Sequence, residues 1–427
     1  MESSPGEVTV GIYVPIRPSG YAGGVEQFVV GLLEGLSASG QPQEYVVITH
    51  PEHPDWLEPH LCENMRIEPR PWQDVVERCR AAVGRLDSVL KPVARPIIDA
   101  VTGRGDPSVP EDDGFLASLD LDVLHCPTQL YVRSPIPSVY NPHDLQHEHY
   151  PDFFESDEIE RRRHLYRTGC RDSHAVDVPS MFVREDLQST YDIDPEKVYP
   201  IPRGPPVGLY EPISEEDIAA TRRKFDLPEG FAFYPAQTWP HKNHRRLIEA
   251  IGYLRENQNV EVPLVCTGRR NEHFESIRAT VRECGVTDLV SFLGYVSETE
   301  LRSLYRLAQF VVIPSLFEGG GFPLLEAWYE GTPVACSGTT SLREKAGDAA
   351  LLFDPDSSID IAGAIKTLST DSERRRHLQK RGTERVGEFN WELTGTVYQA
   401  LYRWVAGAEL GPNERVLLDR SQSGDLP

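Results

Sequence analysis

The stretch SLFEGGGFPLLEA, residues 315–327, sets two carboxylates, Glu318 and Glu326, around three consecutive glycines. The apolar run FVVI before it is typical of a buried strand, and Pro323 suits the first turn of a helix. A glycine loop lets backbone N–H groups approach a phosphate, and a helix N-terminus favours an anion. Carboxylates beside an anion need other partners, and sugar hydroxyls are suitable donors. The simpler alternative is a flexible loop before an acidic helical turn.

Short β-branched runs alternate with helical patterns on both sides of this stretch. Alternation of this kind is typical of parallel sheets with crossover helices. It pauses at 201–212, IPRGPPVGLYEP, where prolines and glycines indicate a linker between two doubly wound domains that face a cleft. The sequence predicts strands at 8–14, 45–49, 123–126, 137–140, 231–234, 262–266, 290–293, 310–313, 333–336 and 350–353, and helices at 25–37, 245–256, 274–284 and 298–307.

The composition argues against several classes of protein. With 39% hydrophobic and 26% charged residues the chain is globular, and no apolar window is long enough to cross a membrane. The first ten residues lack a signal-peptide pattern, so a cytoplasmic location is expected. A net charge of -23 argues against nucleic acid as a partner, because its phosphates would be repelled. Seven scattered cysteines without a C-x-x-C pair fit reduced thiols, and no metal is expected.

The basic residues are unusual, since only seven of the 43 are lysines and the others are arginines. An acidic, lysine-poor surface suggests a protein from a high-salt cell, where screening reduces self-repulsion. GC-rich coding combined with an ordinary acidic pI is the alternative.

Glu318 and Glu326, with seven residues between them, match the Glu-x7-Glu motif of retaining glycosyltransferases. The context, FEGGGFPLLEAWYEGTPVACSGTTSLREKAGDAALLFDP at 317–355, resembles family 4 glycosyltransferases of the GT-B fold. The resemblance covers most of the chain and is strongest at 231–355. It implies an α/β fold of two Rossmann-like domains, with the first Glu beside the donor sugar and the second on the ribose.

A second motif, YPAQTWPHKNHRRLIEA, places Lys242 after a strand, with Asn243 as the predicted cap of the next helix. Lysine at this place holds the donor diphosphate in the family, although a lone lysine at a helix start is usually solvated. The arginine that many members carry a few residues earlier is replaced by Gln237 and Thr238. The candidates for a second phosphate cation are Arg203 in the linker and Arg269 after the strand at 262–266.

Other stretches also match the family. SFLGYVSETELRSLY resembles the segment whose backbone reads the nucleobase, and YAGGVEQFVVGLLEGL resembles the loop that approaches donor phosphate and acceptor. YNPHDLQHEHYP holds His143, which the resemblance places by the reacting sugar. The alternatives are a plain turn for the glycine pair of the first loop and a structural histidine for His143. Thr340, Ser341 and Glu344 are expected near the diphosphate and sugar. The resemblance thus assigns Glu318, His143 and Lys242 to catalysis and Glu326, Gly23, Gly24, Gly319, Gly320, Gly321, Phe322, Tyr295 and Val296 to donor binding. Arg203 and Arg269 are added to the donor-binding set as the candidates for the second phosphate cation.

The resemblance implies an N-terminal acceptor domain at 1–204, a nucleotide-sugar donor domain at 205–390 and a helical segment at 391–420 that packs back on the N-terminal domain. Residues at about 52–113 do not continue the alternation and are interpreted as an insertion, and the tail SQSGDLP at 421–427 is expected to be disordered. The implied function is retaining transfer of a hexose from a nucleotide-diphosphate sugar to a glycan or lipid-linked acceptor. The nucleotide sugar is a co-substrate, and no cofactor is expected. The alternatives are a nucleotide-sugar epimerase or a phosphorylase on the same fold, or a catalytically silent sugar-nucleotide-binding subunit.

The segment 78–104 is basic within an acidic chain, and its apolar residues recur at helical spacing. Basic amphipathic segments can lie on anionic membranes, so peripheral contact with the inner face of the membrane is one hypothesis. A helix that packs on its own domain is the alternative.

Overall fold

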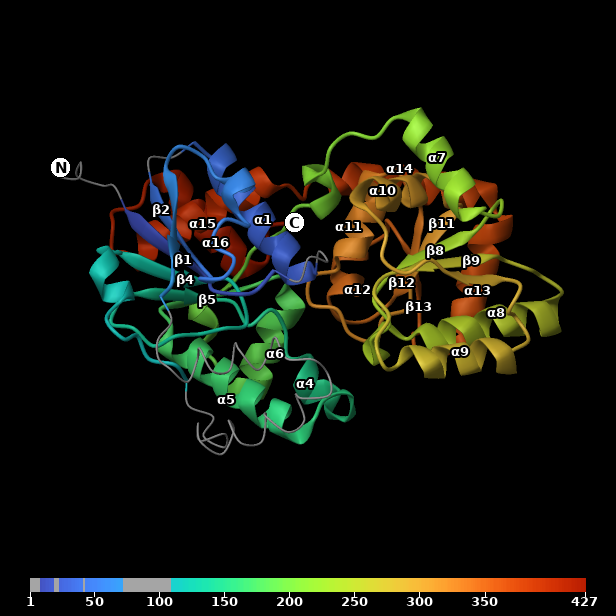
Figure 1. The fold of residues 1–427 in the computed structure, drawn as a ribbon, viewed down its shortest axis with the longest axis horizontal. Coiled ribbons are helices and arrows are strands. Elements are labelled where there is room, and N and C mark those ends of the chain that lie inside the picture. Colours follow the sequence, from blue (N-terminus) through green and yellow to red (C-terminus); the bar gives the residue numbers. More distant parts are fainter. Residues whose placement is uncertain (1–7, 19–22, 41–42, 72–108) are drawn as a thin grey trace.

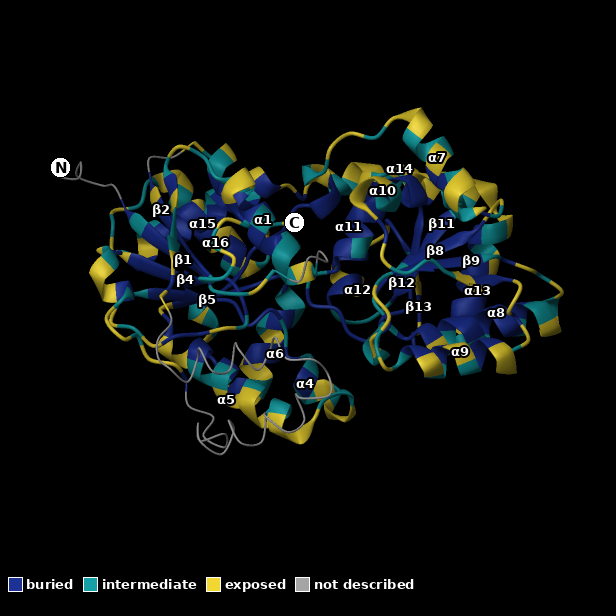
Figure 2. Cartoon of the chain, viewed as in Figure 1, coloured by how far each residue is buried: buried dark blue, intermediate teal, exposed yellow. Residues whose placement is uncertain are grey.

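The computed structural model describes residues 8–18, 23–40, 43–71 and 109–427. The basic segment 78–104 and most of the predicted insertion lie outside the described residues. Two parallel sheets form the cores of two lobes, with helices on both sides of each sheet (Figure 1). The predicted α/β fold of two Rossmann-like domains is confirmed. Figure 2 shows that the strands are buried and that the exposed residues lie mainly on the outer helices and loops.

The N-terminal sheet has seven strands in the order β3-β2-β1-β4-β5-β6-β7. β1 pairs in parallel with both β2 and β4, with Val10 opposite Tyr45 and Val123. The strands are β1 (Thr9–Val14), β2 (Glu44–Thr49), β3 (Met65–Pro69), β4 (Val123–Cys126), β5 (Ser138–Tyr140), β6 (Ala175–Val178) and β7 (Val198–Pro200).

Three strands of this sheet were not predicted. β3 lies within the region 52–113, which the sequence predicted to interrupt the alternation, so that prediction is wrong for Met65–Pro69. Its sequence MRIEP alternates charged and apolar residues, as suits a half-exposed edge strand rather than a buried run. β6, AVDV, carries a charged residue within it, and β7, VYP, ends in proline, so neither forms a continuous apolar run.

The C-terminal sheet has six strands in the order β10-β9-β8-β11-β12-β13. The run FVVI forms the fully buried β11, which lies in the interior of the sheet between β8 and β12. The strands are β8 (Ala232–Pro235), β9 (Leu264–Thr267), β10 (Val290–Phe292), β11 (Phe310–Ile313), β12 (Val334–Ser337) and β13 (Leu351–Phe353).

The helices that cover these sheets also shape the loops at their carboxyl edges. The α-helices are α1 (Gly24–Ala38), α4 (Gln146–His149), α5 (Ser156–Asp172), α6 (Met181–Tyr191), α7 (Glu215–Phe225), α8 (His244–Gln258), α9 (Phe274–Glu283), α10 (Glu298–Leu307), α11 (Phe322–Tyr329), α12 (Thr340–Ala346), α13 (Ser358–Thr370), α14 (Ser372–Val386), α15 (Trp391–Val405) and α16 (Pro412–Ser423). Short 3-10 helices occur at η1 (Glu58–His60), η2 (Leu116–Leu119), η3 (Pro151–Phe153), η4 (Pro195–Lys197), η5 (Pro206–Leu209) and η6 (Pro240–Lys242).

Helix α15 packs tightly on α1 of the N-terminal lobe. A Cβ on Gly35 would lie 2.2 Å from the Trp391 carbonyl oxygen, so only glycine allows the two helices this approach. A buried polar network joins α15 to the sheet, since Tyr402 hydroxyl lies 2.7 Å from His125 Nδ1 and Tyr398 hydroxyl donates to Asp177 at 2.6 Å. These contacts fix the C-terminal helix to the lobe that begins the chain.

Helix α16 continues to Ser423, so the predicted disordered tail at 421–427 begins instead as helix. Ser421 is buried and its hydroxyl donates to the Pro200 carbonyl oxygen at 2.7 Å, which holds the helix end against β7. A membrane-spanning helix would need a longer apolar stretch than any helix among the described residues has.

Candidate active site

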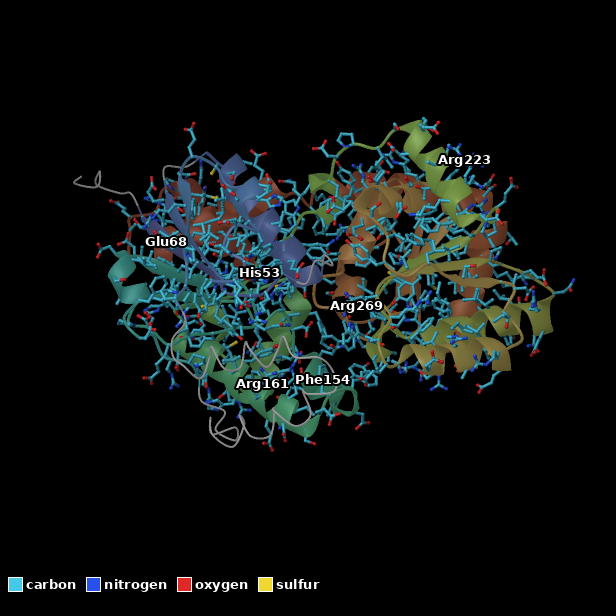
Figure 3. The ribbon with its side chains drawn as sticks, viewed as in Figure 1. His53, Glu68, Phe154, Arg161, Arg223 and Arg269 are labelled. Carbon is cyan, nitrogen blue, oxygen red and sulfur yellow. The ribbon has the colours of Figure 1, made fainter. Side chains whose placement is uncertain are left out.

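A cavity of about 430 Å³ lies between the two lobes, where loops after β4, β5, β8, β9 and β11 converge. The carboxyl ends of parallel strands are the usual place for ligands in such sheets. Figure 3 shows Arg269 among the side chains between the lobes. The lining includes every residue that the sequence assigned to the site: Gly23, Gly24, His143, Arg203, Lys242, Arg269, Tyr295, Val296, Glu318, Gly319, Gly320, Gly321, Phe322 and Glu326.

Lys242 and Glu318 form an ion pair in this cavity, with 2.6 Å between Lys242 Nζ and Glu318 Oε1. Lys242 ends the 3-10 helix η6, and the chain then turns through Asn243 at φ 60° into α8. The Asn243 side chain does not cap α8 as predicted. Its amide instead donates to the carbonyl oxygens of Pro314 and Pro355, at 2.9 and 2.8 Å, and so ties the Lys242 loop to the loop after β11.

The glycine loop approaches the N-terminal lobe closely. A Cβ on Gly319 would lie 3.0 Å from both the His143 carbonyl oxygen and the Asp144 Cβ. Gly321 has φ 66°, a conformation that favours glycine, and α11 begins at the next residue, Phe322. The loop therefore directs the N-terminus of α11 toward the cavity, where its N–H groups favour an anion.

Glu326 is buried on α11 and accepts a hydrogen bond of 2.6 Å from the Tyr305 hydroxyl. Burial raises the pKa of Glu326 to about 7, and the nearby Glu330 carboxylate adds to this rise, while the Tyr305 hydrogen bond opposes it. Glu330 itself is paired with Arg302 and Arg306. Near neutral pH the Glu326 carboxyl can take up or release a proton.

His143 is held in a left-handed conformation, with φ 66°, and its ring is buried. Nε2 lies 3.1 Å from the Pro127 carbonyl oxygen, and Nδ1 lies 3.5 Å from Arg203 Nη1. Burial, together with the Arg203 charge, holds the pKa of His143 well below its usual range. The ring is therefore neutral, and these hydrogen bonds assign its proton to Nε2.

The remaining predicted residues lie around the rim and floor. Tyr295 and Arg269 are exposed, whereas Val296 is buried next to Tyr295. Gly24 approaches the other lobe, since a Cβ there would lie 3.8 Å from the Phe322 ring. Arg203 is buried on the floor, and its guanidinium carbon lies 3.9 Å from the centre of the Phe28 ring.

The loop after β12 differs from its prediction, because Thr340, Ser341 and Glu344 are not among the residues that line the cavity. Thr340 and Ser341 instead hydrogen-bond the backbone of Glu318, at 3.2 and 2.6 Å. The Glu344 carboxylate accepts from the N–H groups of Met181 and Phe182 at the start of α6, at 3.0 and 2.9 Å. These residues hold the site in place without facing it.

Sequence reasoning missed several lining residues: Gln27, Gln129, Trp239, His241 and Gly268. Trp239 has a half-exposed side chain, and its indole N–H donates to Gln237 at 3.0 Å. Trp239 and His241 both lie within the motif that identified Lys242, so their nearness to that lysine was the available signal.

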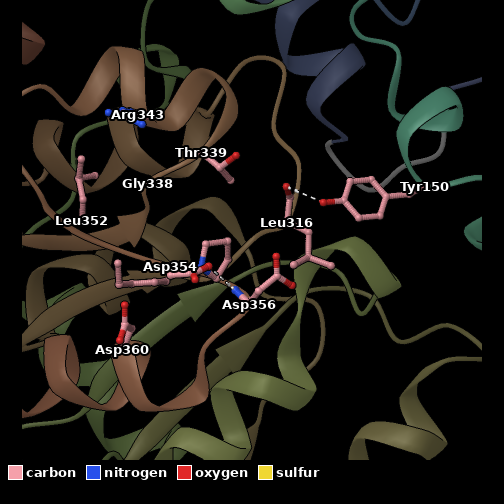
Figure 4. Close-up of a pocket in the computed structure, with 11 residues that line it drawn as sticks. Tyr150, Leu316, Gly338, Thr339, Arg343, Leu352, Asp354, Asp356 and Asp360 are labelled. Atoms are coloured by element: carbon pink, nitrogen blue, oxygen red, sulfur yellow. Dashed lines mark hydrogen bonds between the residues drawn. The ribbon is translucent and has the colours of Figure 1, made fainter.

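A second cavity, of about 500 Å³, lies beside the first and is shown in Figure 4. Tyr150 reaches across to it from the N-terminal lobe and donates to the Leu316 carbonyl oxygen at 3.3 Å. Its carboxylates, on Asp354, Asp356 and Asp360, are exposed, and Asp356 is paired with Arg246 at 2.9 Å. It contains none of the predicted site residues, so the cavity with Lys242 and Glu318 is the better candidate.

Two family models match consecutive parts of the chain. The model of glycosyltransferase family 4 matches residues 22–207, and the model of glycosyl transferases group 1 matches residues 217–385. These ranges correspond to the two lobes and contain every residue assigned to the cavity.

Curated relatives include two transferases. O-antigen chain mannosyltransferase B of Escherichia coli is 34% identical over 184 residues, which cover 43% of this chain and 48% of that protein. D-inositol 3-phosphate glycosyltransferase of Corynebacterium glutamicum is 28% identical over 278 residues, 62% of this chain and 66% of that protein. The chain thus spans between about half and about two thirds of the length of these relatives.

Solved structures share the arrangement of the two lobes. Sucrose-phosphate synthase from Thermosynechococcus elongatus has a TM-score of 0.67 at 22% identity, covering 94% of this chain and all of that one. Anabaena HepE, solved with UDP and glucose, has a TM-score of 0.66 at 16% identity, covering 92% of this chain and 99% of that one. At these identities the likeness shows the fold, which is GT-B. With both family models matching its two lobes, the chain belongs to the GT-B glycosyltransferases of the family 4 type.

Proposed function

We propose that the chain transfers a hexose from a nucleoside diphosphate sugar to a hydroxyl of a glycan or lipid-linked acceptor, with retention of the anomeric configuration. One observation carries this proposal. Lys242, the N-terminus of α11 and the carboxylates Glu318 and Glu326 converge on one cavity between the lobes. Positive groups there suit a diphosphate. The two carboxylates suit the hydroxyls of the two groups that the diphosphate joins, the ribose and the sugar.

In the proposed reaction the bond between C1 of the sugar and the diphosphate oxygen breaks, and C1 bonds to the acceptor oxygen. The acceptor proton passes to the oxygen of the leaving phosphate on the same face, so no protein base is needed. Lys242 and the backbone N–H groups of the glycine loop stabilise the charge that develops on the diphosphate. The close approach of the lobes at Gly319 would limit the access of water to this region and so limit hydrolysis.

The two carboxylates have separate roles in this proposal. Glu326 accepts hydrogen bonds from the ribose, and Glu318 accepts them from the transferred sugar. Glu318 is also the partner of Lys242, at 2.6 Å, so the donor phosphate competes with Glu318 for the ammonium group. Binding of the donor would therefore change the position of Lys242 relative to Glu318.

Mannose is the first donor sugar to test, because the relatives include O-antigen mannosyltransferases of Escherichia coli and Salmonella typhimurium. Their names also favour a growing glycan as the acceptor. We leave the nucleobase of the donor unassigned. HepE was solved with UDP, but the candidate base-reading segment of this chain, around Tyr295 and Val296, is proposed to act through its backbone.

The test is a thermal-shift panel of GDP, UDP, ADP and dTDP sugars, followed by transfer assays with the stabilising donor and glycan or lipid-linked acceptors. NMR of the product would report the anomeric configuration, and Glu318→Gln serves as the matched inactive control. Because protein cations offset the diphosphate charge in this proposal, EDTA should leave the rate unchanged. Binding without transfer to any acceptor would favour a silent binding subunit, and an inverted product would contradict the proposed reaction.

A further inference from the structure

Arg203 is a buried cation whose guanidinium is only partly satisfied. The residue is 3% exposed, and it lines the cavity between the lobes. Among the described residues, its Nε and Nη2 atoms have no hydrogen-bond partner. Nη1 has one long contact, 3.5 Å to His143 Nδ1. A buried charge without full pairing is costly, and a protein that retains one usually has a use for it.

The surroundings of Arg203 place its guanidinium beside the glycine loop. Nη1 lies 3.9 Å from the position of a Cβ on Gly320, so the guanidinium faces the glycine loop at the N-terminus of α11. The Phe28 ring supports the other face of the guanidinium, with 3.9 Å between the guanidinium carbon and the ring centre. Lys242 lines the same cavity. Two cations and a helix N-terminus therefore converge from both lobes.

His143 fixes the orientation of Arg203. Because Nε2 donates to the Pro127 carbonyl oxygen, Nδ1 carries a lone pair that can accept from Arg203 Nη1. Both ring nitrogens of His143 thus have partners on the N-terminal side of the cavity. In this geometry the imidazole holds the arginine, and neither nitrogen is directed to a sugar.

We infer that Arg203 is the second cation of the diphosphate site, supplied from the N-terminal side of the linker, and that His143 is its positioning residue. This inference rests on the proposed function. A guanidinium binds two phosphate oxygens through parallel N–H groups, and the two unpartnered nitrogens of Arg203 supply such a pair. Arg269, the other candidate, is exposed at the rim, where water weakens a phosphate contact.

The test compares affinities for a nucleoside diphosphate and its parent nucleoside, using whichever of GDP, UDP, ADP and dTDP the wild-type protein binds. Arg203→Gln should weaken the diphosphate about tenfold or more and leave the nucleoside within about twofold. Arg203→Lys should restore part of the loss. Arg269→Gln, the other candidate, should weaken the diphosphate less than Arg203→Gln does, and Arg278→Gln, an exposed residue of α9 outside the cavity, is the matched control. Equal diphosphate affinity in Arg203→Gln and wild type, or a larger loss in Arg269→Gln, would overturn the inference. If the wild type binds none of the four diphosphates, the proposed function fails instead.

Two further measurements separate binding from folding. Arg203→Met removes a buried charge that is incompletely paired. The Tm of this variant without ligand should therefore equal or exceed that of wild type, whereas the loss of a structural arginine would lower the Tm. A lower Tm combined with unchanged diphosphate affinity would make Arg203 structural and overturn the inference. His143→Phe keeps a ring but removes the acceptor, so it should weaken the diphosphate less than Arg203→Gln does. The double variant should match Arg203→Gln alone, and additive losses would show that His143 acts independently.

Discussion

At the scale of single residues, the ion pair of Lys242 and Glu318 would link phosphate binding to sugar binding in the proposed reaction. Lys242→Ala should weaken donor binding and slow transfer, because a charge-assisted contact to phosphate is worth about 1.5–3 kcal/mol. The substitution also leaves Glu318 without its partner at 2.6 Å. Donor Kd and kcat/KM would be measured with Lys224→Ala as the control, since Lys224 pairs with Glu300 on the protein surface. Unchanged kinetics would remove Lys242 from the site.

Glu326 predicts a pH dependence of stability that one substitution can isolate. Its pKa is raised from an ordinary value of 4.5 to about 7 in the folded protein, so between these values only the folded state keeps the proton. Wild-type stability therefore loses a contribution of about 3 kcal/mol as pH rises from 4.5 to 7, and the contribution is fully present below that range. Glu326→Gln cannot titrate at this position and should lack this loss.

Chemical denaturation of wild type and Glu326→Gln at pH 5 and pH 8 would test this prediction. The difference between the two proteins is the relevant quantity, because other buried groups, such as His143 with its lowered pKa, titrate equally in both. If the difference in the free energy of unfolding between the two proteins is the same at both pH values, the pKa of Glu326 lies near its ordinary value and the prediction is wrong.

The grouping of the assigned residues in one cavity could be predicted because most of them lie in short sequence motifs. Glu318, the glycines and Glu326 lie within nine consecutive residues, and Lys242 follows directly on a strand and turn. The choice between Arg203 and Arg269 could not be predicted, since the burial of Arg203 depends on Phe28, which lies far away in the sequence on α1. The inward turn of the His143 ring likewise depends on the long-range contacts with Pro127 and Arg203.

At the scale of elements, α12 connects the glycine loop that carries Glu318 with the other lobe. Its first turn holds the backbone of Glu318 through Ser341, and its Glu344 carboxylate accepts from two N–H groups at the start of α6. A carboxylate at a helix N-terminus stabilises by about 0.3–1 kcal/mol, and salt screens the effect. This contact therefore favours the arrangement in which Glu318 faces the N-terminal lobe.

Glu344→Gln should lower kcat/KM about two- to fivefold in dilute buffer, because the lobes would close less often over the donor. The loss should shrink in molar salt, where the wild-type contact is already screened. Glu388→Gln is the matched control, since Glu388 is equally exposed but pairs with Arg385 in its own lobe. Kinetics identical to wild type at both salt concentrations would show that α12 does not contribute to closure.

Strands formed by continuous apolar runs and several amphipathic helices were predictable, whereas strands interrupted by a charged residue or a proline were not. The run FVVI produced an unambiguous strand, and the helix predicted at 298–307 matches α10 residue for residue. β3 was missed because an edge strand can expose alternate side chains. Its formation as a strand depends mostly on its pairing with β2. The end of α16 was missed because Ser421 is stabilised by Pro200, a contact between distant segments.

At the scale of the whole molecule, the net charge of -23 predicts how stability responds to salt. Two effects oppose each other. Salt screens surface pairs such as Arg255 with Asp288 and Arg381 with Asp348, but exposed pairs contribute only about 0–1 kcal/mol each. Salt also screens repulsion among the excess acids, which acts across the entire surface. With 66 acidic and 43 basic residues, the second effect should be larger.

The Tm should therefore rise from dilute buffer to molar KCl. Neutralising the exposed acids Glu229, Glu256 and Glu283 to Gln should raise the Tm in dilute buffer and reduce the gain from KCl, because less repulsion remains to be screened. Equimolar sucrose, which stabilises folded proteins without screening charge, is the control for the screening effect. A Tm that stays flat or falls with KCl would mean that the acidic composition is ordinary, as GC-rich coding would explain, and is not an adaptation to a high-salt cell.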